Sequence, residues 1–357
     1  MNEWIALPAG EQVSELTVVS RVERERLRDG PVDAASFAAA FDSIEALRQI
    51  EIGANGPRRT TARTSLRVAS WNVERLRHLQ AIGDTLAQLA PDVTLLTEID
   101  KGMARSGNGH RIAELAARLG QGYVYGVEFI ELDRGDPKER AMHAHEVDLL
   151  GFHGNGIVTD LALSRPFLVR LEADGKWFGW EREEPRVGGR MAIGGQIELD
   201  GTKVTLVAVH FESHSDPEHR ASQAAHLLDV IDRYDPVAPV LIGGDFNTST
   251  FSWGTKSHDA ASVAAALVAD PRRRVDVEPY EPLFALMAKR RYDWLRCNVP
   301  GVPTERPDEP IDRVLGKIDW FFSRGLKASL PAVISALKAD GTPSSDHDCL
   351  MVEIGLA

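Results

Sequence analysis

Leu241-Ile242-Gly243-Gly244-Asp245-Phe246-Asn247 is the stretch of this chain that says most about its fold. It begins as a short apolar run, which is typical of a buried β-strand, and it ends in Asp245 and Asn247. Buried charged groups are costly unless they are paired or hold a metal ion. A strand that ends in this way predicts a polar site at one edge of a packed sheet.

Five more segments of the chain place polar residues at the end or the start of an apolar run. They are Val68–Asn72, Val93–Glu98, Val207–His210, Ile318–Phe322 and Ser344–His347. Taken singly, an Asn or Asp after a strand is most often a turn former or a helix cap. Six such ends in one chain are better explained by a single shared site, approached from one edge of a packed core.

The rest of the pattern predicts a mixed α/β fold. Apolar residues at helical spacing predict helices over 79–89, 109–119 and 217–234, and strands are expected at 156–163 and 187–199. Asp200-Gly201 predicts a two-residue hairpin turn before a strand that ends at His210. Strands joined by hairpins, with helices between them, indicate two packed sheets flanked by helices.

Residues 1–66 differ from the rest and are predicted to form an N-terminal extension before a catalytic domain of residues 67–357. The extension holds an amphipathic helix over Ala34–Ile50 and a linker over Gly53–Arg63. Two roles stay open for it, namely a helix packed on the main domain and a lid or partner-binding element. Residues 268–315, rich in Arg, Pro, Asp and Glu, are expected to be an irregular insertion.

Composition limits the classes of function. The chain has 357 residues, with 41 Lys and Arg against 53 Asp and Glu, a net charge of −12. Such a charge argues against a passive nucleic-acid coat, but not against an enzyme acting on phosphates, because bound metal ions add positive charge. Two cysteines exclude a four-cysteine zinc site. Without a signal-peptide pattern or a long apolar run, we expect a cytoplasmic protein with no membrane span.

Taken in order, these segments resemble the endonuclease/exonuclease/phosphatase superfamily, whose fold is that of deoxyribonuclease I. The segments that carry the resemblance are Ser70–Val73, Thr97-Glu98, Gly154–Ile157, Arg186–Arg190, Val209-His210, Gly243–Asn247, Ile318–Trp320 and Ser345–His347, with Arg220 and Gln223 at an Arg-x-x-Gln spacing. The resemblance covers about residues 66–357. It implies a four-layer α/β sandwich of two facing, mostly antiparallel sheets flanked by helices, with the site at one end.

The resemblance also implies a metal site. Glu98 is expected to be the main ligand of a divalent ion, with Asn72 beside it and Asp346 contributing. Carboxylate and amide oxygens suit Mg²⁺ or Mn²⁺, and both one ion and two ions stay open. Asn155 and Arg190 are expected to contact the substrate phosphate, with Arg186 as the alternative to Arg190.

The expected catalytic residues are His210, Asp245, Asn247, Asp319 and His347. By the resemblance, His347 is the general base or a phosphate-contacting residue that Asp319 orients, since imidazole titrates near neutrality and a carboxylate fixes its tautomer. Asp245 and Asn247 would orient the attacking water or a second metal ion. His210 would contact the phosphate or assist the leaving group.

The predicted function is therefore that of a metal-dependent phosphoric ester hydrolase. In-line attack of water on a phosphodiester is favoured, as in a nuclease or phosphodiesterase, with nucleic acid among the possible substrates. The alternatives are a phosphatase or a phospholipase-C-like hydrolase of a small-molecule or lipid phosphate, and a non-enzyme interaction module that uses residues 1–66. Thr97-Glu98-Ile99-Asp100 stands where abasic-site endonucleases carry Gln-Glu-x-Lys, which weighs against abasic-site repair.

Overall fold

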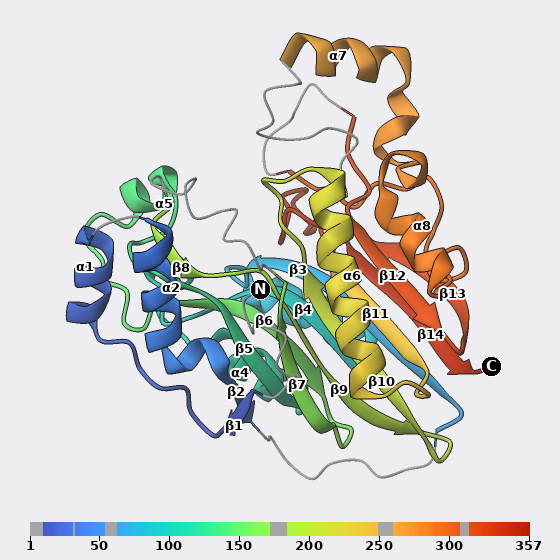
Figure 1. The fold of residues 1–357 in the computed structure, drawn as a ribbon, viewed down its shortest axis with the longest axis horizontal. Helices are drawn as coiled ribbons and strands as arrows, with labels where there is room; N and C mark the ends of the chain where they lie inside the picture. The colour runs from blue at the N-terminus through green and yellow to red at the C-terminus, as the bar shows by residue number, and fades with distance from the viewer. Residues whose placement is uncertain (1–9, 31–32, 54–62, 172–183, 249–259, 308–313) are drawn as a thin grey trace.

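Two β-sheets face each other at the centre of the structure, and helices lie on both outer sides (Figure 1). The structure is a computed structural model that describes residues 10–30, 33–53, 63–171, 184–248, 260–307 and 314–357. Among the strand pairs of these residues, nine are antiparallel and three are parallel. The predicted fold class, with mostly antiparallel sheets, is confirmed.

The larger sheet has nine strands in the order β1-β2-β5-β6-β4-β3-β14-β13, with β8 paired to β5. Their bounds are β1 Glu11–Val13, β2 Gln49–Gly53, β3 Ser65–Arg75, β4 Val93–Lys101, β5 Gly122–Glu131, β6 Phe152–Thr159, β8 Arg186–Gly188, β13 Leu326–Ile334 and β14 Cys349–Leu356. The smaller sheet has the order β12-β11-β10-β9-β7. Its strands are β7 Ser164–Arg170, β9 Met191–Leu199, β10 Thr202–His210, β11 Val240–Asp245 and β12 Asp319–Arg324.

The helices described by the structure are α1 Arg21–Asp29, α2 Ala34–Ser43, α3 Leu79–Leu89, α4 Arg111–Leu119, α5 Pro137–Met142, α6 Pro217–Tyr234, α7 Ala260–Ala269 and α8 Pro282–Lys289. The helices predicted over 79–89 and 217–234 are confirmed at those bounds, and the one predicted over 109–119 begins two residues later. Within these described parts, no helix combines the length and hydrophobicity needed to cross a membrane.

Three apolar layers hold these elements together. One lies between the two sheets, one between the larger sheet and the helices α2, α3 and α4, and one between the smaller sheet and α6 and α8. Neighbouring residues of a strand enter different layers because side chains alternate across a sheet. In β4, Leu95 packs between the sheets and Leu96 packs under the helices, so both faces of this strand are buried.

The N-terminal extension differs from its prediction, because part of it belongs to the larger sheet. The helix expected over Ala34–Ile50 ends at Ser43, and residues 49–53 pair with β5 as strand β2. Backbone pairing with an open sheet edge outweighs the helical spacing of these residues. The linker predicted over Gly53–Arg63 lies mostly outside the described residues.

The single strand predicted over 187–199 is in fact two strands in different sheets. β8 pairs with β5 in the larger sheet, whereas β9 pairs with β7 and β10 in the smaller one. The chain crosses over at Gly188, which has φ +149°, and a Cβ there would lie 2.1 Å from the carbonyl oxygen of Glu128. Because of this crossing, the next charged residue, Arg190, lies between the two sheets.

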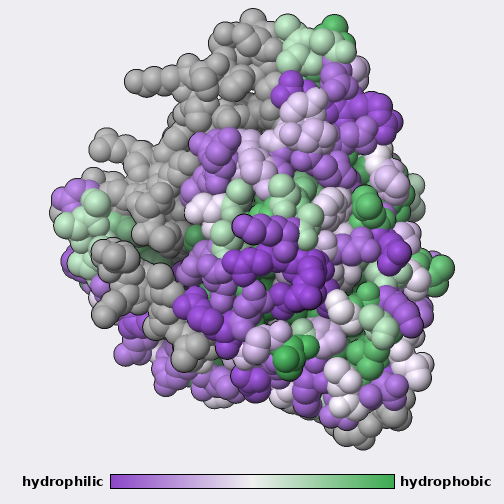
Figure 2. All heavy atoms as spheres, turned by 45° about the vertical axis from the view of Figure 1, so that its right-hand side comes forward, coloured by the Kyte–Doolittle hydropathy of each residue, from purple (hydrophilic) through white to green (hydrophobic). Residues whose placement is uncertain are grey.

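The described residues of the segment 268–315 are more regular than the sequence predicts, since they include helix α8. Helix α8 packs against α6, and Arg220 of α6 donates to Glu281 at 2.6 Å, with both side chains fully buried. The surface on this side, which carries α8, β13 and β14, is mostly hydrophilic, and its hydrophobic residues occur in small separate groups (Figure 2). Arg290 contributes to this surface through ion pairs with Asp229 and Asp232 of α6.

A buried cluster joins β2 to the rest of the larger sheet. Glu51 accepts from Lys101 Nζ at 2.5 Å and from the Tyr123 hydroxyl at 2.8 Å, and it pairs with His110. Burial alone would raise the pKa of the Glu51 carboxyl, but His110 and Lys101 outweigh it and lower the pKa to about 2. The ionised form of Glu51 therefore stabilises the docking of β2.

Replacing Glu51 with Gln is expected to lower the free energy of unfolding by about 2 to 4 kcal/mol, since it leaves buried partners uncompensated. Because the folded-state pKa is depressed, the stabilisation is present above pH 4.5 and is lost as the pH falls towards 2. Urea unfolding at pH 7 measures the effect. Glu198→Gln, in an exposed pair with Lys203, is the control and should change stability by less than about 0.5 kcal/mol. Equal losses in both variants would contradict the prediction.

Candidate active site

The register of the smaller sheet brings three of the predicted residues into one row. His210, at the end of β10, lies opposite Asp245 of β11, which lies opposite Asp319 of β12. Neighbouring strands are about 4.8 Å apart, so the three side chains form a continuous polar group at the end of the sheet. Gly244 allows this close pairing, because a Cβ there would lie 1.9 Å from the carbonyl oxygen of Val209.

Asn72 connects this row to the larger sheet. Its amide nitrogen donates to Glu98 Oε1 and to Asp245 Oδ2, both at 3.1 Å. Its amide oxygen accepts from the backbone N–H of Glu74 at 3.1 Å. Asn72 thus holds two carboxylates, one from each sheet, and its predicted place beside the main metal ligand Glu98 stays a prediction.

His347 lies beside this pair of sheets and is fixed on three sides. Its Nδ1 is 2.9 Å from Asp319 Oδ2, and its Nε2 is 3.7 Å from Asp245 Oδ2 and 3.9 Å from Asp346 Oδ1. The indole N–H of Trp71 donates to the backbone carbonyl of His347 at 2.7 Å. The structure therefore brings together the imidazole and the carboxylate that the sequence paired.

The charges around His347 control its protonation. Burial lowers the pKa of the imidazole, but Asp319, Asp245 and Asp346 outweigh burial and raise it well above 6.5. Burial also raises the pKa of Asp245, against the effect of the histidines. These shifts favour a protonated His347, and they make the neighbouring Asp245 carboxyl easier to protonate.

Asn247 lies next to Asp245 and helps to orient it. Its backbone N–H donates to Asp245 Oδ1 at 2.8 Å, and its side-chain amide donates to the carbonyl of Phe211 at 3.0 Å. Its φ of +47° is tolerated because Asn adopts left-handed backbone more readily than most residues. Asn247 is thereby placed to hold the Asp245 carboxyl in one orientation.

Glu98 faces the open side of the site and has an ion-pair partner that sequence reasoning missed. Arg75 Nη1 donates to Glu98 Oε2 at 3.1 Å, leaving Oε1 to Asn72. Burial raises the pKa of Glu98, but Arg75 and the neighbouring histidines outweigh it and hold the pKa well below its usual range. Glu98 has φ +57°, and its N–H donates to Asn155 Oδ1 at 3.3 Å.

Asn155 and Arg190 are both buried and bound to carboxylates. Asn155 is fully buried and donates to Glu128 Oε2 at 2.8 Å. Arg190 is bound by Glu128 at 2.6 Å and by Glu212 at 3.2 Å. Both side chains are held by buried carboxylates, and the phosphate contact predicted for each stays a prediction. The alternative, Arg186, lies over the Phe129 ring at 4.0 Å and pairs with Glu184.

Glu128 is the centre of this buried group and was also missed by the sequence analysis. It lies 3.4 Å from His210 Nδ1, in addition to its bonds with Asn155 and Arg190. It belongs to β5, a strand that the sequence did not predict, so no strand end marked it. Arg75, in contrast, stands three residues after Asn72, and its position beside that residue was a usable signal.

Replacing Glu128 with Gln is expected to lower the free energy of unfolding by about 3 kcal/mol, since Arg190 and His210 would stay buried with less compensation. Burial raises the pKa of Glu128, but His210 and Arg190 bring it down to about 2. The stabilisation is thus present above pH 4.5 and disappears as the pH falls towards 2. Chemical unfolding measured at pH 7 and pH 3 tests this. A constant difference between Glu128→Gln and wild type at the two pH values would argue against it.

The donor groups at the open side fit a hard divalent cation. Among the residues that the structure describes, Asp346 Oδ1 is buried without a hydrogen-bond partner. Burial raises the pKa of Asp346, and the nearby Glu98 carboxylate raises it further. A further group of possible ligands, within the parts of the chain that are described, is Asp245, Asp319 and His347. Oxygen donors of this kind suit Mg²⁺ or Mn²⁺ better than softer metals.

The geometry agrees with a comparison of the chain with known families. Residues 69–347 match the Endonuclease/Exonuclease/phosphatase family.

The chain belongs to this family.

Members of this family typically hydrolyse phosphoesters and generally use divalent metals. No curated protein matches the chain significantly.

Solved structures share the fold of this chain at low sequence identity. An endonuclease/exonuclease/phosphatase from Beutenbergia cavernae is 18% identical with a TM-score of 0.54, over 83% of this chain and 72% of that one. A functionally unknown conserved protein from Enterococcus faecalis is 14% identical with a TM-score of 0.55, over 82% and 100%. The catalytic domain of human Nocturnin, solved with a bound sulfate anion, is 15% identical with a TM-score of 0.54, over 86% and 98%. These likenesses support the fold.

Proposed function

We propose that this family member is a divalent-metal-dependent phosphoesterase that hydrolyses a phosphodiester by in-line attack of water. The observation that carries the proposal is the position of His347, held at 2.9 Å by Asp319 and next to the carboxylates of Asp245 and Asp346. A fixed imidazole beside carboxylates that suit a hard metal ion is an arrangement for phosphoryl chemistry.

Glu98 and Asp346 are the residues that would hold the metal ion. Both side chains are partly exposed, and Asn72 keeps Glu98 in place. A divalent ion bound there would polarise a phosphoryl oxygen and stabilise negative charge that develops on it.

The chain's own residues supply the proton chemistry. Protonated His347 would donate from Nε2 to a phosphate oxygen, while its Nδ1–H stays on Asp319. Asp245, with a pKa that burial raises, would accept a proton from the attacking water. Asn72 and Asn247 hold that carboxylate in orientation, and His210 would contact the phosphate or the leaving group from the other side.

The balance of charge favours a diester over a monoester. Glu98, Asp245, Asp319 and Asp346 converge on the site, whereas the nearby Arg190 is neutralised by two buried carboxylates. Electrostatic repulsion grows with ligand charge, so a singly charged phosphodiester meets less of it than a doubly charged monoester. The net charge of −12 also disfavours long nucleic-acid tracts, so a short or single-stranded nucleic acid or a small diester fits better.

A hydrolysis panel tests the proposal. Bis-p-nitrophenyl phosphate, p-nitrophenyl phosphate, single- and double-stranded DNA, RNA, sphingomyelin and inositol phosphates would each be incubated with Mg²⁺, Mn²⁺ or EDTA. We expect turnover of a diester that is lost in EDTA. Turnover of monoesters or of sphingomyelin alone would support the phosphatase or phospholipase-C-like alternative. No turnover, with a protein partner captured through residues 1–66, would support the interaction-module alternative.

A further inference from the structure

The site opens on the side of Arg75, Glu98 and Asp346. Their side chains are 19%, 18% and 41% exposed, whereas Asp245 and His210 are each 2% exposed. A substrate phosphate that approaches His347 from this side passes these three residues. Two of them are carboxylates, so Arg75 is the member of this rim that attracts an anion.

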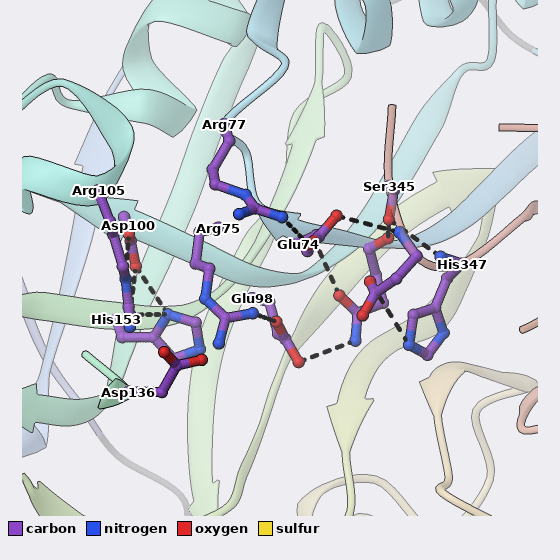
Figure 3. A network of polar contacts seen from close by, with 12 residues as sticks. Glu74, Arg75, Arg77, Glu98, Asp100, Arg105, Asp136, His153, Ser345 and His347 are labelled. Carbon is purple, nitrogen blue, oxygen red and sulfur yellow. Dashed lines mark hydrogen bonds and ion pairs between the residues drawn. The ribbon is translucent and has the colours of Figure 1, made fainter. Parts of the chain in front are cut away.

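The guanidinium of Arg75 is held in a fixed orientation. Nη1 donates to Glu98 at 3.1 Å, and Nε lies 2.9 Å from Glu139 Oε1. Figure 3 shows Arg75 and Glu98 between two polar groups, one around His347 and Ser345 and one around Asp100, Arg105 and His153. The second group fixes Glu139, since Arg105 donates to Glu139 Oε2 at 3.0 Å.

Nη2 of Arg75 makes no hydrogen bond within the described residues, where Nη1 donates to Glu98. A guanidinium held by one hydrogen bond and one ion pair loses little conformational freedom when it binds an anion. Its planar array of donors also matches phosphate oxygens.

We propose that Arg75, on the exposed rim of the site, contacts the substrate phosphate through Nη2. The inference rests on the proposed function, because it assigns a substrate contact in the same site. It requires Arg75 to do more than hold Glu98, and the two roles predict different effects on phosphate and metal binding.

The experiment measures the binding of inorganic phosphate to the full chain in EDTA by calorimetry, and the binding of Mn²⁺ separately. For Arg75→Gln we expect at least a tenfold loss of phosphate affinity, with Mn²⁺ affinity unchanged or higher because a competing cation has left Glu98. Arg75→Lys should recover part of the phosphate affinity, since it keeps the charge but not the planar fork. Unchanged phosphate affinity with weaker Mn²⁺ binding in Arg75→Gln would overturn the proposal, because Arg75 would then only position Glu98.

Two controls separate this result from loss of structure and from failure of the proposed function. Arg21→Gln removes an exposed arginine that also pairs with a glutamate, and it should leave phosphate affinity unchanged. If Arg75→Gln does not fold, Arg75→Lys is used in its place. Unaltered phosphate affinity together with an unaltered KM in Arg75→Lys would then overturn the proposal. Because phosphate binding is measured without turnover, a wild-type protein that cleaves no tested ester but binds phosphate through Arg75 would refute the proposed function alone.

Discussion

Replacing Glu98 with Gln is expected to reduce kcat/KM for the cleaved phosphoester by about 10²- to 10³-fold or more, the range seen when one charge-stabilising group is removed from an active site. Gln has nearly the shape of Glu, so the Asn72 contact at 3.1 Å can persist while the charge is lost. The loss of charge removes the main proposed metal ligand and the ion-pair partner of Arg75. We therefore expect weaker Mn²⁺ binding together with the loss of activity.

Steady-state kinetics and Mn²⁺ titration on the purified variant check this result. Glu198→Gln is a matched control, because Glu198 pairs with Lys203 beside the Asp200-Gly201 turn, at the opposite end of β10 from His210. It should retain activity within about twofold, as surface substitutions away from special features have small effects. Activity in Glu98→Gln equal to that of the control would remove Glu98 from the mechanism.

Replacing Asp319 with Asn is expected to lower kcat by about 10²- to 10⁴-fold, by analogy with the loss of the carboxylate that orients a catalytic histidine. It also changes the pH dependence. Burial lowers the pKa of His347, and Asp319 is the largest of the charges that outweigh burial and raise it. Without that charge the His347 proton dissociates at lower pH, so the alkaline limb of the kcat profile should move towards acid.

The raised pKa of His347 also makes the stability of the fold depend on pH. Since the folded-state pKa of His347 lies above its ordinary value of 6.5, the pairing stabilises the fold fully below pH 6.5. The contribution is lost as the pH rises through the folded-state value. In Asp319→Asn the free energy of unfolding should therefore depend less on pH above neutrality than in wild type. Kinetics and urea unfolding between pH 5 and 10 measure both effects, and an alkaline limb unchanged in Asp319→Asn would show that His347 does not act in its protonated form.

Much of the architecture was predictable because local patterns carry it. Two-sided burial makes β4 and β11 short apolar runs, and the amphipathic spacing of α3 and α6 marks both helices to the residue. The polar residues at the ends of these strands could also be recognised in the sequence. A charged side chain is costly in a buried segment, so a charged residue at the end of an apolar run indicates a site.

The strands that were missed lack such signals. β5 and β13 were not predicted, and β2 was hidden within a helical pattern that tertiary pairing overrides. The split of 187–199 into β8 and β9 depends on Gly188. Its backbone conformation lets the chain cross from the larger sheet to the smaller one, and this crossing cannot be inferred without both sheets. Propensity and periodicity describe neighbours in the chain and carry no information about such long-range partners.

The sequence by itself determined the family resemblance, the two-sheet sandwich and the polar residues at its strand ends, because each of these depends on the spacing of residues close together in the chain. Tertiary structure alone decided the partners: the row of His210, Asp245 and Asp319, the orientation of Asn72, and the burial of Arg190 behind Glu128. The physical reason is that hydrogen bonds and ion pairs form between atoms a few ångströms apart in space. Asn72 and Asp245, for example, meet across two sheets although 173 residues separate them in the chain.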